Sequence, residues 1–179
     1  MTSDEQLILE LQQGSDAAFT ELFLRYRERV YGFFRRRMND VSQAEELAQE
    51  TFLAVLRAAQ RYEPRATFRA YLFGIAFYIL AAHRRKSALD PTASAAPDES
   101  SDPSGTNPDN VIWVRQAVER LEAAEREVLL LREFEELSYE EISKMLHAPI
   151  NTVRSRLFRA RMALREILAT TPEHLGGRK

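Results

Sequence analysis

The 179-residue chain contains no cysteine, and this absence excludes several kinds of site. Without thiols it can form neither a disulfide framework nor a thiolate zinc site, and it has no cysteine nucleophile. The first residues, Met-Thr-Ser-Asp-Glu, lack a basic and apolar export signal, so we expect a cytoplasmic protein. The longest apolar run, residues 70–82, is shorter than the ~20 residues that span a bilayer. It predicts a buried helix and no membrane insertion.

The chain has little excess charge of either sign, with a net charge of −2, but the charges are unevenly placed. Residues 119–141 carry nine glutamates and three arginines, whereas residues 147–168 carry five arginines and one glutamate. Such blocks are compatible both with solvated helix surfaces and with binding faces. The three histidines are scattered and assemble no recognisable catalytic site, so an enzyme is the least expected class.

The alternating pattern of a half-buried strand is also missing, and apolar residues recur at helical spacing throughout. The exception is residues 87–110, which contain four prolines, five acidic residues and no lysine or arginine. This composition predicts a disordered linker. The sequence therefore predicts an all-α protein of two small helical domains, residues 1–87 and 110–169, with a flexible acidic linker at 88–109 and a tail at 170–179.

The first domain is expected to contain four helices. Ser3, Ser15 and Ser42 are the expected N-caps of the first three, and Gly14 ends the first helix. The third helix turns four polar side chains outward, namely Glu45, Glu46, Gln49 and Glu50. Catalytic carboxylates need an enclosed pocket that shifts their pKa values, which an outward face does not provide.

The fourth helix, from Thr67 to about Lys86, is rich in aromatic residues and ends in cations. The aromatic residues are Phe68, Tyr71, Phe73, Phe77 and Tyr78, and the final positions are His83, Arg84, Arg85 and Lys86. In one interpretation the rings form the core and the cations complement the helix dipole. In the other, rings and cations form a stacking platform for single-stranded nucleic acid. The pattern leaves both open.

The second domain contains the pattern of a helix-turn-helix. Ser138 with Glu141 predicts a capping box, His147-Ala148-Pro149 interrupts the helix, and a new helix starts near Asn151. Two short helices joined by a three-residue turn are typical of this DNA-binding motif, and the second helix is its reader.

On a helical wheel, Val153, Leu157, Ala160 and Leu164 form the expected buried stripe of the second helix. The opposite face carries the expected base-reading residues, Asn151, Thr152, Ser155, Phe158 and Arg159. Arg159 suits a bidentate pair with guanine, and Phe158 suits a thymine methyl. Arg154 and Arg161 on one edge and Arg156 on the other are expected to meet phosphates. The alternative is an ordinary amphipathic helix with solvated arginines.

Four segments together resemble a known family, the extracytoplasmic-function (ECF) class of bacterial sigma factors. Residues 17–26 resemble the family's opening segment, and Ala-Glu-Glu-Leu-Ala-Gln-Glu-Thr-Phe at 44–52 resembles its core-polymerase-binding helix. Residues 68–85 resemble the segment that opens the promoter's minus-ten element. Residues 137–161, with Thr-Val-Arg-Ser-Arg-Leu at 152–157, resemble the minus-thirty-five reader.

The resemblance implies a subunit that binds core RNA polymerase and promoter DNA, helps open that DNA, and uses no cofactor and no metal. The first domain would be sigma region 2 and the second sigma region 4, an anti-sigma factor is an expected partner, and the acidic linker would lie in the positively lined RNA path. The residues that bind core RNA polymerase would be Glu45, Glu46, Gln49 and Glu50. Minus-ten contacts would come from Arg65, Phe68, Tyr71, Tyr78, Arg84 and Arg85.

The chain departs from the family pattern at three places. Phe77 and Tyr78 stand where the family often has Arg-Asn, so a stacking contact by Tyr78 would replace polar capture of a base. Tyr71 replaces a common Trp, and His147 stands where Gly is frequent, which predicts a strained or differently shaped turn.

Two alternatives to a sigma factor follow from the residues: a polymerase-independent helix-turn-helix regulator, and a sigma-like protein unable to melt DNA. The acidic stretch at 119–141 predicts low affinity of the free reader for DNA.

Overall fold

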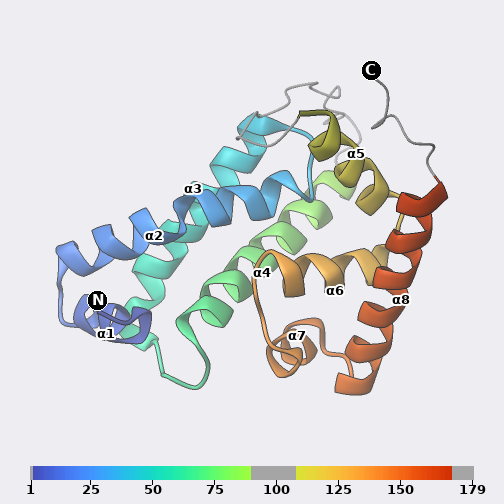
Figure 1. The fold of residues 1–179 in the computed structure, drawn as a ribbon. Helices are drawn as coiled ribbons and strands as arrows, with labels where there is room; N and C mark the ends of the chain where they lie inside the picture. Colours follow the sequence, from blue (N-terminus) through green and yellow to red (C-terminus); the bar gives the residue numbers. More distant parts are fainter. Residues whose placement is uncertain (1, 90–107, 171–179) are drawn as a thin grey trace, which may run out of the picture. The chain divides into compact units, whose positions relative to one another are not determined.

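The computed structural model describes residues 2–89 and 108–170, and every regular element in these ranges is a helix (Figure 1). The chain divides into two compact units, one within residues 1–100 and the other within 101–179. The all-helical prediction is confirmed for the described residues. Of the predicted linker, 88–109, positions 90–107 lie outside them, as does the tail after residue 170. The described ends of that range are helical, because one helix continues to Leu89 and the next begins at Pro108.

The first unit is a bundle of four helices and one short 3-10 turn: α1 (Asp4–Gln12), α2 (Asp16–Arg35), α3 (Val41–Ala58), η1 (Ala59–Arg61) and α4 (Phe68–Leu89). Helix α2 packs against α1 and α3, and α3 packs against α4. Their apolar faces meet around the fully buried rings of Phe33, Phe34 and Phe73. The long α4 is therefore held along its length, with one side left at the surface.

The N-caps explain where these helices begin. Ser3 accepts a hydrogen bond from the amide of Gln6, and Ser15 accepts one from Ala18, as predicted. The predicted cap of α3 at Ser42 is wrong, because the carboxylate of Asp40 accepts the amide of Gln43 at 2.9 Å and starts the helix at Val41. A carboxylate satisfies the free amide and also interacts favourably with the positive end of the helix dipole.

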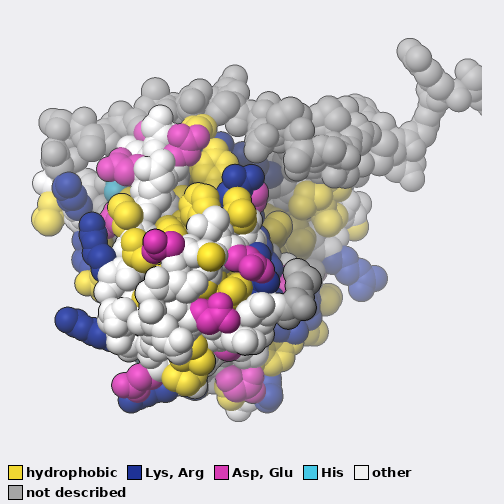
Figure 2. Space-filling model, turned by 90° about the vertical axis from the view of Figure 1, so that its left-hand side faces the viewer, with side chains coloured by type: hydrophobic (Ala, Val, Ile, Leu, Met, Phe, Trp, Pro, Cys, Tyr) yellow, Lys and Arg dark blue, Asp and Glu magenta, His cyan; other side chains and the backbone are white. Residues whose placement is uncertain are grey.

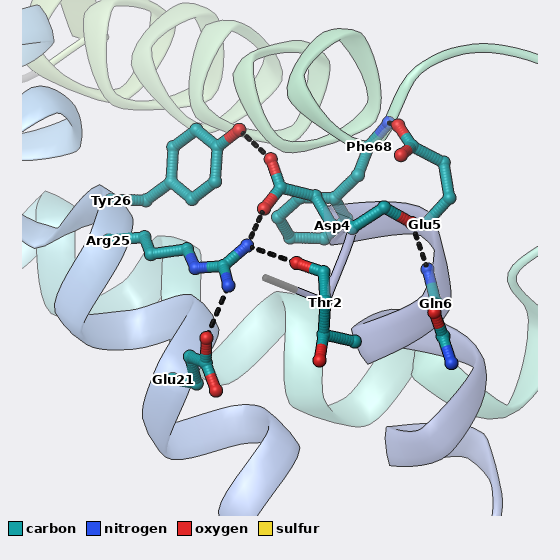
Figure 3. Close-up of polar contacts among 9 residues, drawn as sticks. Thr2, Asp4, Glu5, Gln6, Glu21, Arg25, Tyr26 and Phe68 are labelled. Atoms are coloured by element: carbon teal, nitrogen blue, oxygen red, sulfur yellow. Dashed lines mark hydrogen bonds and ion pairs between the residues drawn. The ribbon is translucent and has the colours of Figure 1, made fainter.

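Helix α1 fixes the start of α4 through polar contacts (Figure 3). Glu5 Oε1 accepts the backbone amide of Phe68 at 3.1 Å, so a side chain of one helix caps another. Beside it, Asp4 accepts hydrogen bonds from Arg25 Nη1, at 2.7 Å, and from the hydroxyl of Tyr26. Burial, together with this bond to Asp4, raises the pKa of Tyr26 to about 12. These contacts set the position of α4 relative to α2.

Over residues 108–170 the second unit also has four helices: α5 (Pro108–Glu119), α6 (Ala123–Glu133), α7 (Tyr139–Leu146) and α8 (Ile150–Thr170). Helix α8 packs against the other three. Val128, Leu131, Ile142, Val153 and Leu157 are buried at their meeting point. One face of α8 is thereby covered and the opposite face is left at the surface.

The turn between α7 and α8 completes the predicted helix-turn-helix. Ser138 and Glu141 form the expected capping box, with bonds of 3.1 and 2.8 Å. His147 ends α7 in the left-handed region, with φ of 50°. This agrees with the unusual turn expected there, since left-handed backbone is costly for a residue with a Cβ. Ser143 Oγ supports the turn by donating to the carbonyl of Ala148 at 2.6 Å.

Candidate nucleic-acid interface

The exposed face of α8 carries the residues expected to read bases. Asn151, Ser155, Phe158 and Arg159 are exposed, and Thr152 is half-buried. Val153, Leu157 and Ala160 are buried on the other side, as predicted, and Leu164, the last residue of the predicted stripe, is half-buried. Phe158 is 66% exposed, so its ring is available for an apolar contact. The face offers hydroxyl, amide, apolar and guanidinium groups for a groove.

Arg159 is exposed but is not a free cation. Its Nε donates to Glu125 Oε1 of α6 at 2.7 Å. The sequence interpretation placed Arg159 on the reading face but did not identify Glu125. The two residues are 34 positions apart, and only the crossing of α6 over α8 brings them together. In the sequence, only the glutamate-rich composition of residues 119–141 indicated that a carboxylate could lie near Arg159.

The cations expected to meet phosphates lie on the flanks of the same helix. Arg154 is exposed, and its Nη1 donates to Asn151 Oδ1 at 3.4 Å. Arg156 is half-buried. Arg161 Nη2 donates to Glu133 Oε1 at 2.6 Å, and this bond is the main cause of a raised pKa for Arg161.

Some aromatic residues of α4 belong to the core, and others are exposed and available for stacking on bases. Phe68 and Phe73 are core rings, and Phe68 is only 1% exposed. We therefore withdraw Phe68 from the expected minus-ten contacts, because its ring packs edge-on against Tyr26, with centroids 5.5 Å apart. Tyr78, by contrast, is 69% exposed. The helix thus has a core side and a surface side, and stacking is available only on the latter.

Tyr71 lies between these extremes. It is half-buried and packs edge-on against Tyr62, with ring centroids 4.9 Å apart, and burial raises its pKa. Arg65, in the loop before α4, is exposed and pairs with Glu63. Near the other end of α4, Arg84 and Arg85 are exposed. Apart from Phe68, each residue expected to contact the minus-ten element is therefore exposed or half-buried.

The outward face of α3 extends beyond the predicted polar residues. Glu45, Glu46, Gln49 and Glu50 are all exposed. Leu53 and Leu56 continue this face by a further turn and are also exposed. The sequence interpretation missed these two leucines, although helical spacing was a usable signal, since Leu53 follows Glu50 by three residues and Leu56 follows Leu53 by three. Carboxylates beside apolar side chains suit a protein partner better than an anionic polymer.

The face of the molecule drawn in Figure 2 shows no single sign of charge. The face drawn in Figure 2 mixes acidic, basic and apolar side chains, and no continuous basic field covers it. The described residues contain no cluster of histidine and carboxylate side chains that could hold a metal ion. Within those same ranges, no helix has the length and hydropathy needed to cross a membrane.

Comparison with known proteins finds a different sigma-factor region in each of the two units. Residues 22–88 match the family described as "Sigma-70 region 2", and residues 112–164 match "Sigma-70, region 4". The RNA polymerase sigma-H factor of Pseudomonas aeruginosa is 33% identical, covering 92% of this chain and 93% of that protein. The ECF RNA polymerase sigma-E factor of Escherichia coli K12 is 31% identical, covering 90% and 92%.

A solved structure shows the same fold. It contains the sigma factor RpoE in complex with the anti-sigma factor NepR from Bartonella quintana, and its similar chain is 24% identical with a TM-score of 0.70, covering 86% of this chain and 98% of that one. Identity above 30% across nine-tenths of two relatives decides the family. The chain belongs to the extracytoplasmic-function sigma factors of RNA polymerase.

Proposed function

We propose that this chain is a promoter-specificity subunit, which binds core RNA polymerase, directs it to particular promoters and helps open the minus-ten DNA. The observation that carries the proposal is the presence of both matched sigma regions, in order, each on its own compact unit. A regulator that acts without polymerase needs the helix-turn-helix but gives no reason for a complete region 2. The proposed role includes no catalysis of its own and no cofactor, and it acts in the cytoplasm, where the polymerase and the chromosome are.

The minus-thirty-five element is assigned to α8. Its reading face contributes Asn151, Thr152, Ser155, Phe158 and Arg159, and Arg154, Arg156 and Arg161 meet the phosphates. The support is the exposure of this face, opposite a buried stripe. Base contacts determine which sequence is preferred, whereas phosphate contacts contribute affinity for any sequence. Substitutions on the reading face should therefore change base preference, and substitutions of the three arginines should change affinity for all promoters.

The minus-ten element is assigned to the surface side of α4 and the loop before it, through Arg65, Tyr71, Tyr78, Arg84 and Arg85. Tyr78 supplies an exposed ring on which an unpaired base can stack. The arginines supply charge for the displaced strand. Base stacking by Tyr78 favours an opening-competent sigma factor over one that binds polymerase but cannot melt DNA.

Core polymerase is assigned to α3, through Glu45, Glu46, Gln49 and Glu50 with Leu53 and Leu56. A face that places exposed leucines next to carboxylates offers both apolar area and charge, and protein interfaces use both. We also propose an anti-sigma factor as a partner, since a similar chain is solved in complex with one.

Transcription in vitro with purified core polymerase, on a pool of templates with randomised promoters, tests the proposal. We expect transcripts only when both proteins are present, from a subset of templates that share two spaced elements. Strong binding of one palindromic site by this chain alone, without any transcript on adding core enzyme, would support the polymerase-independent regulator instead.

A further inference from the structure

Two ion pairs join α6 to α8 on either side of one buried residue. Ala160 is completely buried, and its neighbours Arg159 and Arg161 reach back to Glu125 and Glu133, respectively. Helix α6 therefore crosses α8 at the point where a predicted base reader and a predicted phosphate contact are adjacent in sequence. The same two helices thus form two arginine–glutamate ion pairs, Arg159–Glu125 and Arg161–Glu133, which can be compared.

The two pairs differ in how firmly the carboxylate is held. The side chain of Glu125 is 15% exposed, whereas that of Glu133 is 46% exposed. Glu125 also lies in the first turn of α6, where the helix dipole stabilises a negative charge, and its own amide donates to the cap residue Glu122 at 3.2 Å. The Glu125 carboxylate is therefore the less accessible of the two, while the Glu133 pair is an ordinary surface ion pair of small energetic value.

The atom used in the Glu125 pair matters for base recognition. Arg159 donates through Nε, and this contact does not use the end-on edge of the guanidinium, which consists of one N–H from each of Nη1 and Nη2. A guanine presents two acceptors, O6 and N7, and a bidentate pair needs two parallel N–H groups in a fixed plane. An arginine already held in one orientation loses less conformational entropy when it forms such a pair.

We propose that Glu125 is a positioning residue for Arg159, holding its guanidinium so that Nη1 and Nη2 face the base edge and sharpening discrimination at one base pair. This inference rests on the proposed function, because it concerns the same reading face. The opposite role is masking, in which Glu125 only cancels the charge of Arg159. Masking predicts that removal of the carboxylate strengthens binding to every sequence, whereas positioning predicts weaker discrimination at a single position.

The test uses the complete chain assembled with core polymerase and templates whose minus-thirty-five element is randomised. Bound templates are sequenced to give the base preference at each position for wild type, R159A, E125A, E125Q and the matched control E133A. R159A identifies the position that Arg159 reads. E125A should lower discrimination at that same position on the order of 3- to 10-fold, as expected for groups in direct contact. The double variant of Glu125 and Arg159 should add little to R159A.

The conservative variant separates positioning from masking. A glutamine retains an oxygen that can accept from Arg159 Nε, so E125Q should keep most of the discrimination, although it loses the same charge as E125A. Because both variants lose the favourable charge at the start of α6, a difference between them does not arise from helix stability, which thermal unfolding of each variant verifies. E133A should leave every base preference unchanged.

Three results overturn the inference. The first is that E125A keeps the wild-type base preference at the position where R159A relaxes it. The second is that E125A and E125Q gain equally in binding to all sequences. The third is that R159A itself has the base preference of wild type. A wild-type chain that selects no sequence with core polymerase is a distinct result, because it contradicts the proposed function itself.

Discussion

The carboxylate of Glu5 accepts the backbone amide of Phe68 at 3.1 Å, across 63 positions of the sequence. This contact ties α1 to the first residue of the helix that carries Tyr71 and Tyr78. It makes the short N-terminal helix part of the support for the proposed minus-ten surface.

Replacing Glu5 with alanine should destabilise the first unit by about 1 kcal/mol, the usual cost of removing a helix cap. Glu5→Gln retains an acceptor oxygen and should lose less. Chemical denaturation measures both, with Glu28→Ala, an exposed glutamate on α2, as the control. Equal stability of the Glu5→Ala and Glu28→Ala proteins would show that the cap contributes nothing.

Tyr26 should make the stability of the protein fall at alkaline pH. Its folded-state pKa, about 12, lies above the ordinary value of 10.0, so deprotonation is harder in the folded chain. The resulting stability is fully present below pH 10 and is lost as the pH rises from 10 to 12.

Tyr26→Phe should remove this dependence and also the bond to Asp4, lowering the free energy of unfolding at pH 8 by about 1 to 2 kcal/mol. Denaturation curves at several pH values between 8 and 11 measure both effects. Tyr31→Phe, at a half-buried position of the same helix, is the control. A decline above pH 10 that is as steep in Tyr26→Phe as in wild type contradicts the assignment.

His147→Gly should stabilise the second unit by about 0.5 to 1 kcal/mol. Glycine avoids the Cβ clash of left-handed backbone, and this gain exceeds the added entropy of the unfolded chain. Gln13→Gly is the matched control, because Gln13 also caps a helix C-terminus but has φ of −85°. Thermal unfolding should show a gain at position 147 and none at position 13. A loss at position 147 would mean that the imidazole has a stabilising contact.

Arg159→Ala should cost about 1 to 3 kcal/mol at one promoter base pair, because a bidentate base contact is lost. Arg156→Ala should weaken all promoters alike and lower the salt slope of binding by about one unit. Holoenzyme binding to promoter variants at several salt concentrations distinguishes them. If the two variants behave alike, the division of α8 into a reading face and phosphate flanks is wrong.

Tyr78→Ala should reduce promoter opening roughly 10-fold, since stacking contributes about 1 to 3 kcal/mol per base. Tyr78→Phe retains the ring face and should open promoters nearly as well as wild type. Leu24→Ala, which removes another exposed apolar side chain, serves as the control. Opening rates with core polymerase provide the measurement, and a wild-type rate in Tyr78→Ala rules out the stacking role.

Helical periodicity was sufficient to predict the all-helical fold and the buried stripe of α8, because both depend on local spacing. The start of α3 was misplaced, since two potential caps, Asp40 and Ser42, lie within three residues of each other and only one is used. Phe68 was assigned to the surface, because a helix that is apolar almost all round does not show which ring faces the core. The sequence also did not reveal the pairing of Arg159 with Glu125, which depends on how α6 crosses α8.

Permanganate reactivity of promoter thymines tests the central claim most directly, because permanganate modifies unpaired thymines. The account predicts reactive thymines across the minus-ten element only when this chain and core polymerase are present together, and none with either protein alone. Core polymerase that binds the chain but leaves every thymine unreactive, at a promoter that the chain selects, would contradict it.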